Sequence, residues 1–353
     1  MPRAALPLSR PARTSPARWR EVLAAPAVAL VTLVVALVAT QEAGVRFRDP
    51  DNVAAGYVAM VGFAVALLVG LDIVVRAARQ SGSRRPSREA MHAVRRTRWT
   101  RQRLAAAAGG LLSFYVTYLA YRNLKGVIPF LRPGVLFDRE LAELERGLLG
   151  GQDPAALLHA LLGTGIAAHV LSAVYVAFIV FLPLSLGVAL VFARDLSTSL
   201  FFATALSLNW LIGAGSYFVL PALGPAYADP GLFAALPHTE VTRLQDVLLD
   251  DRIGFLRDPE TGTPQAIAAF ASLHIAMSFT ALAAAHLLNL GRRLKVALWV
   301  WLVVTVVATV YLGWHYVVDD VAGVLIGAAS LALAKVLTGF DVRAARRARP
   351  PAR

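Results

Sequence analysis

Eight long apolar runs constrain the fold of this chain more than any other feature of its sequence. They cover residues 22–40, 53–75, 104–121, 166–192, 200–220, 266–290, 296–312 and 316–337. A helix needs roughly 20 mostly apolar residues to cross a bilayer, and most of these runs approach or exceed that length. The sequence therefore predicts an all-α fold, a polytopic membrane bundle of about eight transmembrane helices.

Composition narrows the chemistry that such a bundle can perform. The chain is 57% hydrophobic and 16% charged, which is a poor fit to a soluble globular domain, and it has no cysteine. Disulfides, thiolate nucleophiles and cysteine-based metal sites are therefore excluded. Any chemistry must come from His, Asp, Ser, Arg and Lys.

The excess of basic residues fits a membrane protein and not a nucleic-acid partner. The net charge is +13, but the arginines cluster in short segments between the apolar runs. No basic patch is interleaved with aromatics in a soluble domain, so we expect no nucleic-acid binding. The many alanines and arginines suit a GC-rich bacterium, which suggests a bacterial cell membrane.

Four basic segments predict the orientation. They are the N-terminal tail, residues 76–103 with ten arginines against one glutamate, the connection around Arg292, and the C-terminal tail. With eight spans all four fall on one side, and short cytoplasmic segments carry such an excess of Lys and Arg. We therefore expect both termini to be cytoplasmic.

The connections also suggest how the chain divides. We expect an N-terminal tail and accessory transmembrane hairpin over 1–75, a basic cytoplasmic linker over 76–103, a six-helix catalytic core over 104–338, and a basic cytoplasmic tail over 339–353. The long connection 222–265 is a candidate lid or acceptor site. Residues 138–149 and 154–162 have the pattern of short amphipathic helices, either at the membrane interface or packed on the bundle.

Three polar clusters lie at the ends of apolar runs. The first runs from Arg122 through Lys125 to Arg132, the second is Ser272-Leu273-His274, and the third runs from His315 to Asp320. Ionisable groups at membrane depth are costly and mark functional sites. The predicted topology brings all three clusters to the non-cytoplasmic side. Three aromatic residues in or just before the last cluster, Tyr311, Trp314 and Tyr316, are interpreted as an interfacial belt.

The third cluster contains a histidine and a carboxylate at helical spacing. His315 and Asp319 are four residues apart, so they share one face of a helix. A carboxylate bonded to one imidazole nitrogen fixes the ring and leaves the other nitrogen as a nucleophile or base. This spacing favours Asp319 over Asp320 as the partner.

These clusters resemble the signatures of the type 2 phosphatidic acid phosphatase superfamily, which are K-x6-R-P, P-S-G-H and S-R-x5-H-x3-D. Lys125 to Pro133 match the first signature fully. Ser272 and His274 keep the second, with Ala271 and Leu273 in place of Pro and Gly. His315 and Asp319 keep the third, but Ala308 and Thr309 stand where the family has Ser and Arg.

The departures themselves form a pattern. Ser-Leu-His combined with His-Tyr-x-x-Asp and no arginine resembles the inositol phosphorylceramide synthase branch, an inositolphosphotransferase group. The sequence YFVLPALGP at 217–225 is similar to that branch as well. The resemblance covers about residues 104–337.

The resemblance implies a role for each residue of the site. His315 would attack phosphorus to form a phosphohistidine, Asp319 would orient it, and His274 would protonate the leaving oxygen and deprotonate the acceptor. Ser272, Lys125 and Arg132 would hold the non-bridging oxygens. The gap left by the missing arginine could be filled by Arg122, Arg243, Arg252 or Arg257. Lys125 and Arg132 could instead anchor the interface by snorkelling.

The sequence thus favours a lipid phosphotransferase that takes its substrate from the bilayer, with no metal and no other cofactor, because protein cations can serve the phosphate. The acceptor would be a polyol or a second lipid. The alternative is a lipid phosphate phosphatase that uses water. A lipid transporter or a non-catalytic scaffold is the alternative from another class, although transporters more often place their sites at the membrane midplane.

Overall fold

The computed structural model describes residues 19–49, 53–264 and 267–347, and within these ranges every regular element is a helix. Seven helices of the described chain are long and apolar enough to cross a membrane. They are α1 (Trp19–Glu42), α2 (Val53–Ser81), α4 (Arg101–Leu131), α7 (Ile166–Phe192), α8 (Leu196–Val219), α12 (Arg292–Tyr311) and α13 (Val317–Thr338). The predicted all-α polytopic bundle is confirmed, and its apolar helices indicate an integral membrane protein.

The sixth predicted span, 266–290, is a shorter helix than expected, and its first residue lies outside the described ranges. α11 (Leu273–Leu287) has 15 residues, which gives a rise of about 22 Å against a hydrocarbon core of about 30 Å. The segment before it is irregular because its backbone bonds elsewhere. The Ala269 N–H donates to Ala222 O at 2.9 Å, and the Ser272 N–H donates to Asp319 O at 3.0 Å. Such partners allow irregular backbone inside a membrane bundle.

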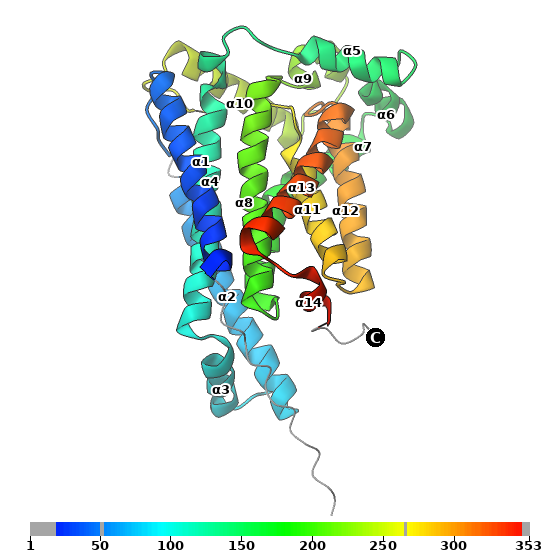
Figure 1. Ribbon diagram of the computed structural model, residues 1–353. Coiled ribbons are helices and arrows are strands. Elements are labelled where there is room, and N and C mark those ends of the chain that lie inside the picture. The colour runs from blue at the N-terminus through cyan, green and yellow to red at the C-terminus, as the bar shows by residue number, and fades with distance from the viewer. Residues whose placement is uncertain (1–18, 50–52, 265–266, 348–353) are drawn as a thin grey trace, which may run out of the picture.

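Successive long helices run in opposite directions, and α11 continues the alternation (Figure 1). One end of the bundle carries α3 (Arg88–Arg98), the α11–α12 turn and α14 (Val342–Arg347). The other end carries α5 (Asp138–Leu148), α6 (Pro154–Leu162), α9 (Pro225–Ala228), η2 (Pro230–Phe233) and α10 (Glu240–Arg257). Residues 1–18 and 348–353, in the predicted basic tails, lie outside the described residues.

α8 forms the centre of the bundle and packs against α4, α7, α11 and α13. Small residues let neighbouring helices approach it closely. At Gly213, for example, an added Cβ would lie 2.5 Å from Cδ2 of Leu273, the first residue of α11. The helices of the predicted accessory hairpin also pack on the core, α1 along α4 and α8, and α2 along α7. Close packing on α8 therefore fixes where α11 begins.

A buried ionic cluster closes the end of the bundle that carries α3. Asp72 accepts hydrogen bonds from Arg76 Nε and Arg98 Nε, both at 2.7 Å, and from Trp99 Nε1 at 3.1 Å. Arg98 also donates to two backbone carbonyls at the end of α7, which a helix otherwise leaves unpaired. We call Asp72, Arg76, Arg98 and Trp99 the Asp72 cluster. Through this cluster, the predicted linker 76–103 is packed against α2 and the end of α7.

The two short helices predicted from the sequence are present as α5 and α6, but only α5 is amphipathic, since α6 is almost entirely apolar and leaves Leu161 exposed. They lie at the end of the bundle opposite the Asp72 cluster (Figure 1). α5 buries Asp138, Leu141 and Glu145 and exposes Leu144 and Leu148. Its buried face therefore carries two carboxylates as well as apolar side chains.

The predicted interfacial belt of Tyr311, Trp314 and Tyr316 is wrong, because all three side chains are buried. The Tyr311 hydroxyl donates to Gly163 O at 2.7 Å, and Trp314 stacks on a tyrosine of α7 with ring centroids 5.1 Å apart. These rings pack the turn between α12 and α13 into the bundle. The Tyr311 and Tyr316 hydroxyls bond to protein groups in place of the membrane surface, whereas Trp314 Nε1 has no hydrogen-bond partner in the described chain.

Candidate active site

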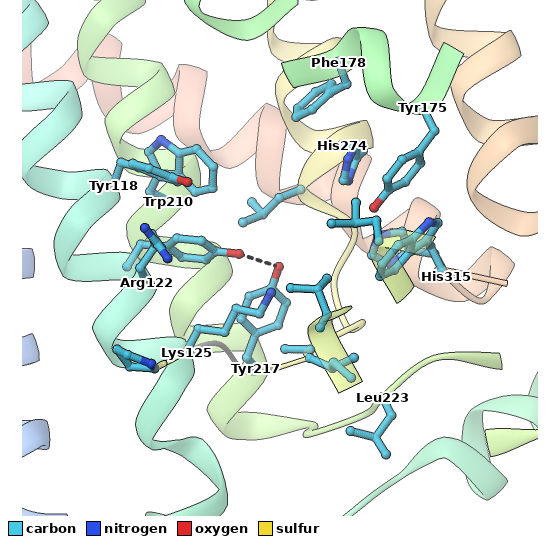
Figure 2. Close-up of a pocket in the computed structure, with 18 of the residues that line it drawn as sticks. Tyr118, Arg122, Lys125, Tyr175, Phe178, Trp210, Tyr217, Leu223, His274 and His315 are labelled. Carbon is cyan, nitrogen blue, oxygen red and sulfur yellow. Dashed lines mark hydrogen bonds between the residues drawn. The ribbon is translucent and has the colours of Figure 1, made fainter. Parts of the chain in front are cut away.

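A cavity of about 380 Å³ lies within the end of the bundle that carries α5 and α10. Its wall comes from α2, α4, α7, α8, α10, α11, the segment before α11 and the turn before α13. His274 and His315 lie on one side, and Arg122 and Lys125 lie on the other (Figure 2). Residues from the three polar clusters that are distant in sequence thus meet at one hollow.

The two histidines are presented by different elements. His274 is the second residue of α11, and His315 belongs to the turn between α12 and α13. Their ring centroids are 5.9 Å apart. Tyr175 and Phe178 of α7 hold the His274 ring, with centroid distances of 4.4 and 4.2 Å. This separation leaves room for a small group between the two imidazoles.

Asp319 lies against one nitrogen of His315. Asp319 Oδ2 is 3.5 Å from His315 Nδ1 and also accepts the Tyr316 N–H at 2.9 Å. Asp319 is fully buried, and its backbone oxygen receives the Ser272 N–H. A carboxylate anchored in this way can orient the imidazole and leave its other nitrogen for chemistry.

The neighbouring carboxylate, Asp320, has another partner. Thr309 Oγ1 donates to Asp320 Oδ2 at 3.0 Å. Thr309 occupies the position at which the third signature has arginine. Thr309 therefore forms a hydrogen bond with Asp320 and does not supply the positive charge that an arginine would.

Burial sets the charge state of His315, which is 5% exposed. Loss of water disfavours the imidazolium and lowers the pKa of His315 to about 4, although the negative charge of Asp320 acts in the opposite direction. At neutral pH the ring is therefore neutral. A neutral imidazole has a lone pair available to form a bond.

Two cations of α4 face the cavity. Arg122 is 7% exposed, its Nη1 lies 4.0 Å from Asp49 Oδ1, and that nitrogen has no hydrogen-bond acceptor in the described chain. The Lys125 side chain reaches from the same helix toward the middle of the cavity (Figure 2). A buried donor without a partner, such as Arg122 Nη1, is costly, so an anion entering the cavity would be stabilised by it and by the charge of Lys125.

Two of the predicted phosphate ligands are not among the residues that line the cavity. Arg132 lies beside a separate hollow of about 90 Å³ and donates from Nη1 to Phe218 O at 2.6 Å, at the end of α8. Ser272 is fully buried as the N-cap residue of α11, and its Oγ has no hydrogen-bond partner within the described ranges. The structure therefore brings together His274, His315, Arg122 and Lys125, with Asp319 behind His315.

Of the four arginines that could replace the missing cation, Arg122 lines the cavity. Arg243 is exposed and pairs with Glu240 at 3.2 Å, and Arg257 is also exposed. Arg252 borders the smaller hollow beside Arg132. The geometry of the cavity thus favours Arg122 as the replacement for the missing arginine of the third signature.

The sequence interpretation missed an aromatic wall beside the cations. Tyr118, Tyr121, Trp210 and Tyr217 line the cavity, and the Tyr121 and Tyr217 hydroxyls are 3.4 Å apart (Figure 2). A signal was present, because Tyr118, Tyr121, Arg122 and Lys125 follow the i, i+3, i+4, i+7 spacing of one helix face. A polar and aromatic stripe on an apolar helix predicts an inward-facing surface.

The long connection 222–265 borders the cavity from the end of the bundle, and its last residue lies outside the described ranges. Leu223, Leu244 and Leu248 contribute to the wall. Gln245 of α10 donates to Leu312 O at 2.9 Å, next to the turn that carries His315. α10 is therefore held against the element that presents one of the two histidines.

In the described part of the chain, no group of three or more His, Asp or Glu side chains is arranged to hold a metal ion. The comparison with family models shows a match to the PAP2 superfamily over residues 139–333. This is more than half of the chain and includes both histidines and Asp319, but it begins after Lys125 and Arg132. Neither the curated proteins nor the solved structures gave a match.

Proposed function

Because the chain belongs to the PAP2 superfamily, a family of phosphatase and phosphotransferase type, we propose that it transfers a phosphoryl or phospho-headgroup from a membrane lipid through a phosphohistidine at His315. The observation that carries this proposal is the pair of imidazoles 5.9 Å apart at the cavity. One of them is backed by Asp319, and Arg122 and Lys125 lie opposite. No other part of the described chain combines nucleophile, acid and cations.

The first step forms a nitrogen–phosphorus bond. Asp319 Oδ2 lies 3.5 Å from Nδ1 of His315, so the other ring nitrogen attacks phosphorus while the bond to the lipid alcohol breaks. His274 gives its proton to that leaving oxygen. An anionic phosphate beside His274 favours the protonated ring that this step requires.

The second step returns the enzyme to its starting state. His274 takes a proton from the acceptor hydroxyl, the acceptor oxygen bonds to phosphorus, and the bond to His315 breaks. Charge spreads over the non-bridging oxygens in both steps, so Lys125 and Arg122 stabilise the transition states. Ser272, which the resemblance assigns to the phosphate, is buried behind the cavity wall beside His274, so a phosphate contact would require its Oγ to become accessible.

We favour an alcohol over water as acceptor. The resemblance of Ser272-Leu273-His274 and His315-Tyr316 to the inositol phosphorylceramide synthase branch supports transfer. The aromatic wall beside Lys125 also supports it, since flat rings and phenol hydroxyls suit a polyol. Hydrolysis by the same intermediate is the alternative. In transfer to an alcohol, the connection 222–265 would act as a lid or acceptor site. Deletion of part of this connection should change the acceptor preference.

The orientation in the membrane is part of the proposal. Basic segments gather at the end of the bundle opposite the cavity (Figure 1), and cytoplasmic ends are the basic ones. The termini are then cytoplasmic, and the cavity faces the non-cytoplasmic leaflet of a bacterial membrane. The core 104–338 would carry the catalysis, since it contains the family match and α4.

The test is turnover by the full chain purified in detergent. Lipid phosphates and phospholipids are offered with and without a polyol, and wild type is compared with His315→Ala. His286→Ala is the matched control, because His286 is exposed at the far end of α11. We expect a new phospholipid that depends on the polyol, with free phosphate as the hydrolytic alternative. Equal inactivity of wild type and His315→Ala on every lipid would favour a transporter or scaffold.

A further inference from the structure

Two buried acids on α5 touch the elements that present His315. Asp138 and Glu145 are 8% and 4% exposed, and their spacing of seven residues places them on one helix face. The other acids of α5, Glu140 and Glu143, are exposed and pair only with Arg139 among the described residues. The buried acids are therefore set apart from the solvated face of the same helix.

Asp138 joins the connection after α8 to the residue that follows His315. Its carboxylate accepts the Leu223 N–H at 2.9 Å and the Gly224 N–H at 2.8 Å. It also accepts the Tyr316 hydroxyl at 3.2 Å. One side chain thus holds two segments that are far apart in the sequence.

Glu145 holds the start of α13. Its Oε2 accepts the Val317 N–H at 2.8 Å, and Val317 is the first residue of that helix. The first N–H groups of a helix have no partner within it, so a carboxylate from another helix acts as a cap and favours the positive end of the dipole. Val317 is two residues after His315, so this cap fixes the exit of the turn that carries the histidine.

The segments held by the two acids also interlock with each other. The Ala226 N–H donates to Gly313 O at 2.9 Å. Gly224 has φ +99°, and a Cβ there would lie 2.6 Å from Trp314 O. The turn 313–316 is therefore in contact with the connection after α8 on one side and with the start of α13 on the other.

We infer that Asp138 and Glu145 are positioning residues, which hold His315 in line with the phosphate through Tyr316 and Val317. This inference rests on the proposed function. Neither acid lines the cavity, so neither touches the reacting atoms. Their effect is on geometry, and a displacement of about 1 Å in a catalytic group can cost on the order of 100-fold in rate.

The experiment measures kcat and KM of the full chain in detergent, together with its thermal midpoint. Glu145→Ala removes the cap, and we expect kcat to fall about 10- to 100-fold with KM for the lipid within about twofold of wild type. Glu145→Gln keeps an oxygen that can accept the Val317 N–H, and should restore kcat to within about threefold of wild type. Glu143→Ala, on the exposed face of α5, is the matched control and should leave both constants unchanged.

A second variant keeps the inference testable if Glu145→Ala does not fold. Tyr316→Phe removes only the hydroxyl that Asp138 accepts, and the same loss in kcat without a change in KM is expected, several-fold in size. Wild-type kcat in the folded alanine or phenylalanine variant would overturn the inference. So would a loss in Glu145→Ala that Glu145→Gln does not repair. These outcomes differ from failure of the proposed function, in which wild type and His315→Ala are equally inactive.

Discussion

The two ends of the bundle both bury ionisable side chains, but they satisfy them differently. In the Asp72 cluster each carboxylate oxygen has a donor within 2.7 Å, and Trp99 adds a third bond. Beside the cavity, His315 Nδ1, Ser272 Oγ, Asp319 Oδ1 and Arg122 Nη1 have no hydrogen-bond partner in the described ranges. Unpaired buried polar atoms cost free energy and need an explanation.

The difference separates a structural cluster from a site. Paired charges with satisfied hydrogen bonds hold α2, α3 and α7 together and leave nothing for a ligand to bind. A buried donor that lacks a partner, such as Arg122 Nη1, is prepared for an anion, because a bound phosphate would accept its hydrogen bond. Buried ionisable side chains therefore stabilise the fold at one end of the bundle and are available for chemistry at the other.

The largest effect that distinguishes the two ends of the bundle is expected from removal of the nucleophile. His315→Ala should lower kcat/KM by at least about 1000-fold, since it removes the nucleophile that forms the proposed covalent intermediate. Its thermal midpoint should stay near that of wild type, because the imidazole makes few bonds that hold the fold. Initial rates and a melting curve of the purified variant check both expectations. Residual activity above a few per cent would contradict the assignment.

The reverse pattern is expected at the other end. Asp72→Ala leaves Arg98 buried without its carboxylate and should lower the free energy of unfolding by about 3 kcal/mol. At temperatures well below its midpoint, kcat should equal that of wild type. Denaturant titration in detergent and a parallel activity assay measure the two effects. A kcat loss comparable to that of His315→Ala would remove the distinction between the two ends.

The cations of the first cluster sharpen the comparison within α4. Lys125→Ala should lower kcat/KM about 10- to 100-fold, because it removes a charge that faces the cavity. Arg132→Ala should change it by less than about threefold, since Arg132 caps the end of α8 instead. Steady-state kinetics on one lipid donor separates the two. Equal losses of kcat/KM in the two variants would indicate that Lys125 and Arg132 both bind the phosphate.

The smallest expected effect is in the pH profile. Burial lowers the pKa of His315 to about 4, so the nucleophile is lost only as pH falls through that value and is intact from about pH 5 upward. For a phosphodiester lipid, whose phosphate does not titrate in this range, the acid limb of kcat/KM should lie near pH 4. A limb near pH 6.5 would indicate a solvated histidine and a more open cavity than the structure has.

The sequence predicts the helical architecture well, because apolar length is a local property. It overestimates 266–290, since the irregular start of that segment is set by bonds to Ala222 and Asp319 that no local pattern encodes. Motif spacing predicts His274, His315, Asp319 and Lys125 as site residues, and the structure places His274, His315 and Lys125 at one cavity with Asp319 beside His315. Asp138 and Glu145 were missed because acids on a short amphipathic helix resemble a solvated face, and only the tertiary contacts with Leu223, Gly224, Tyr316 and Val317 give them a role.

Arg132 illustrates the limit of a motif match. It completes the first signature together with Lys125, yet the end of α4 turns its side chain toward the carbonyl of Phe218. Helix spacing places Lys125 and Arg122 on the inner face of α4, whereas Arg132 follows the last residue of that helix. A signature fixes residue types and separations, but the direction of a side chain after a helix end depends on tertiary contacts.

The central claim is that His315 carries the phosphorus between donor and acceptor, and a trapping measurement tests it most directly. Wild type, His315→Ala and His286→Ala are mixed with a phospholipid labelled at phosphorus, quenched in alkali, and mapped by mass spectrometry. We predict label on the peptide that contains His315, stable in alkali and released by acid, in wild type and His286→Ala but not in His315→Ala. Turnover of the lipid by wild type with no labelled histidine, or with label on another residue, would contradict the account.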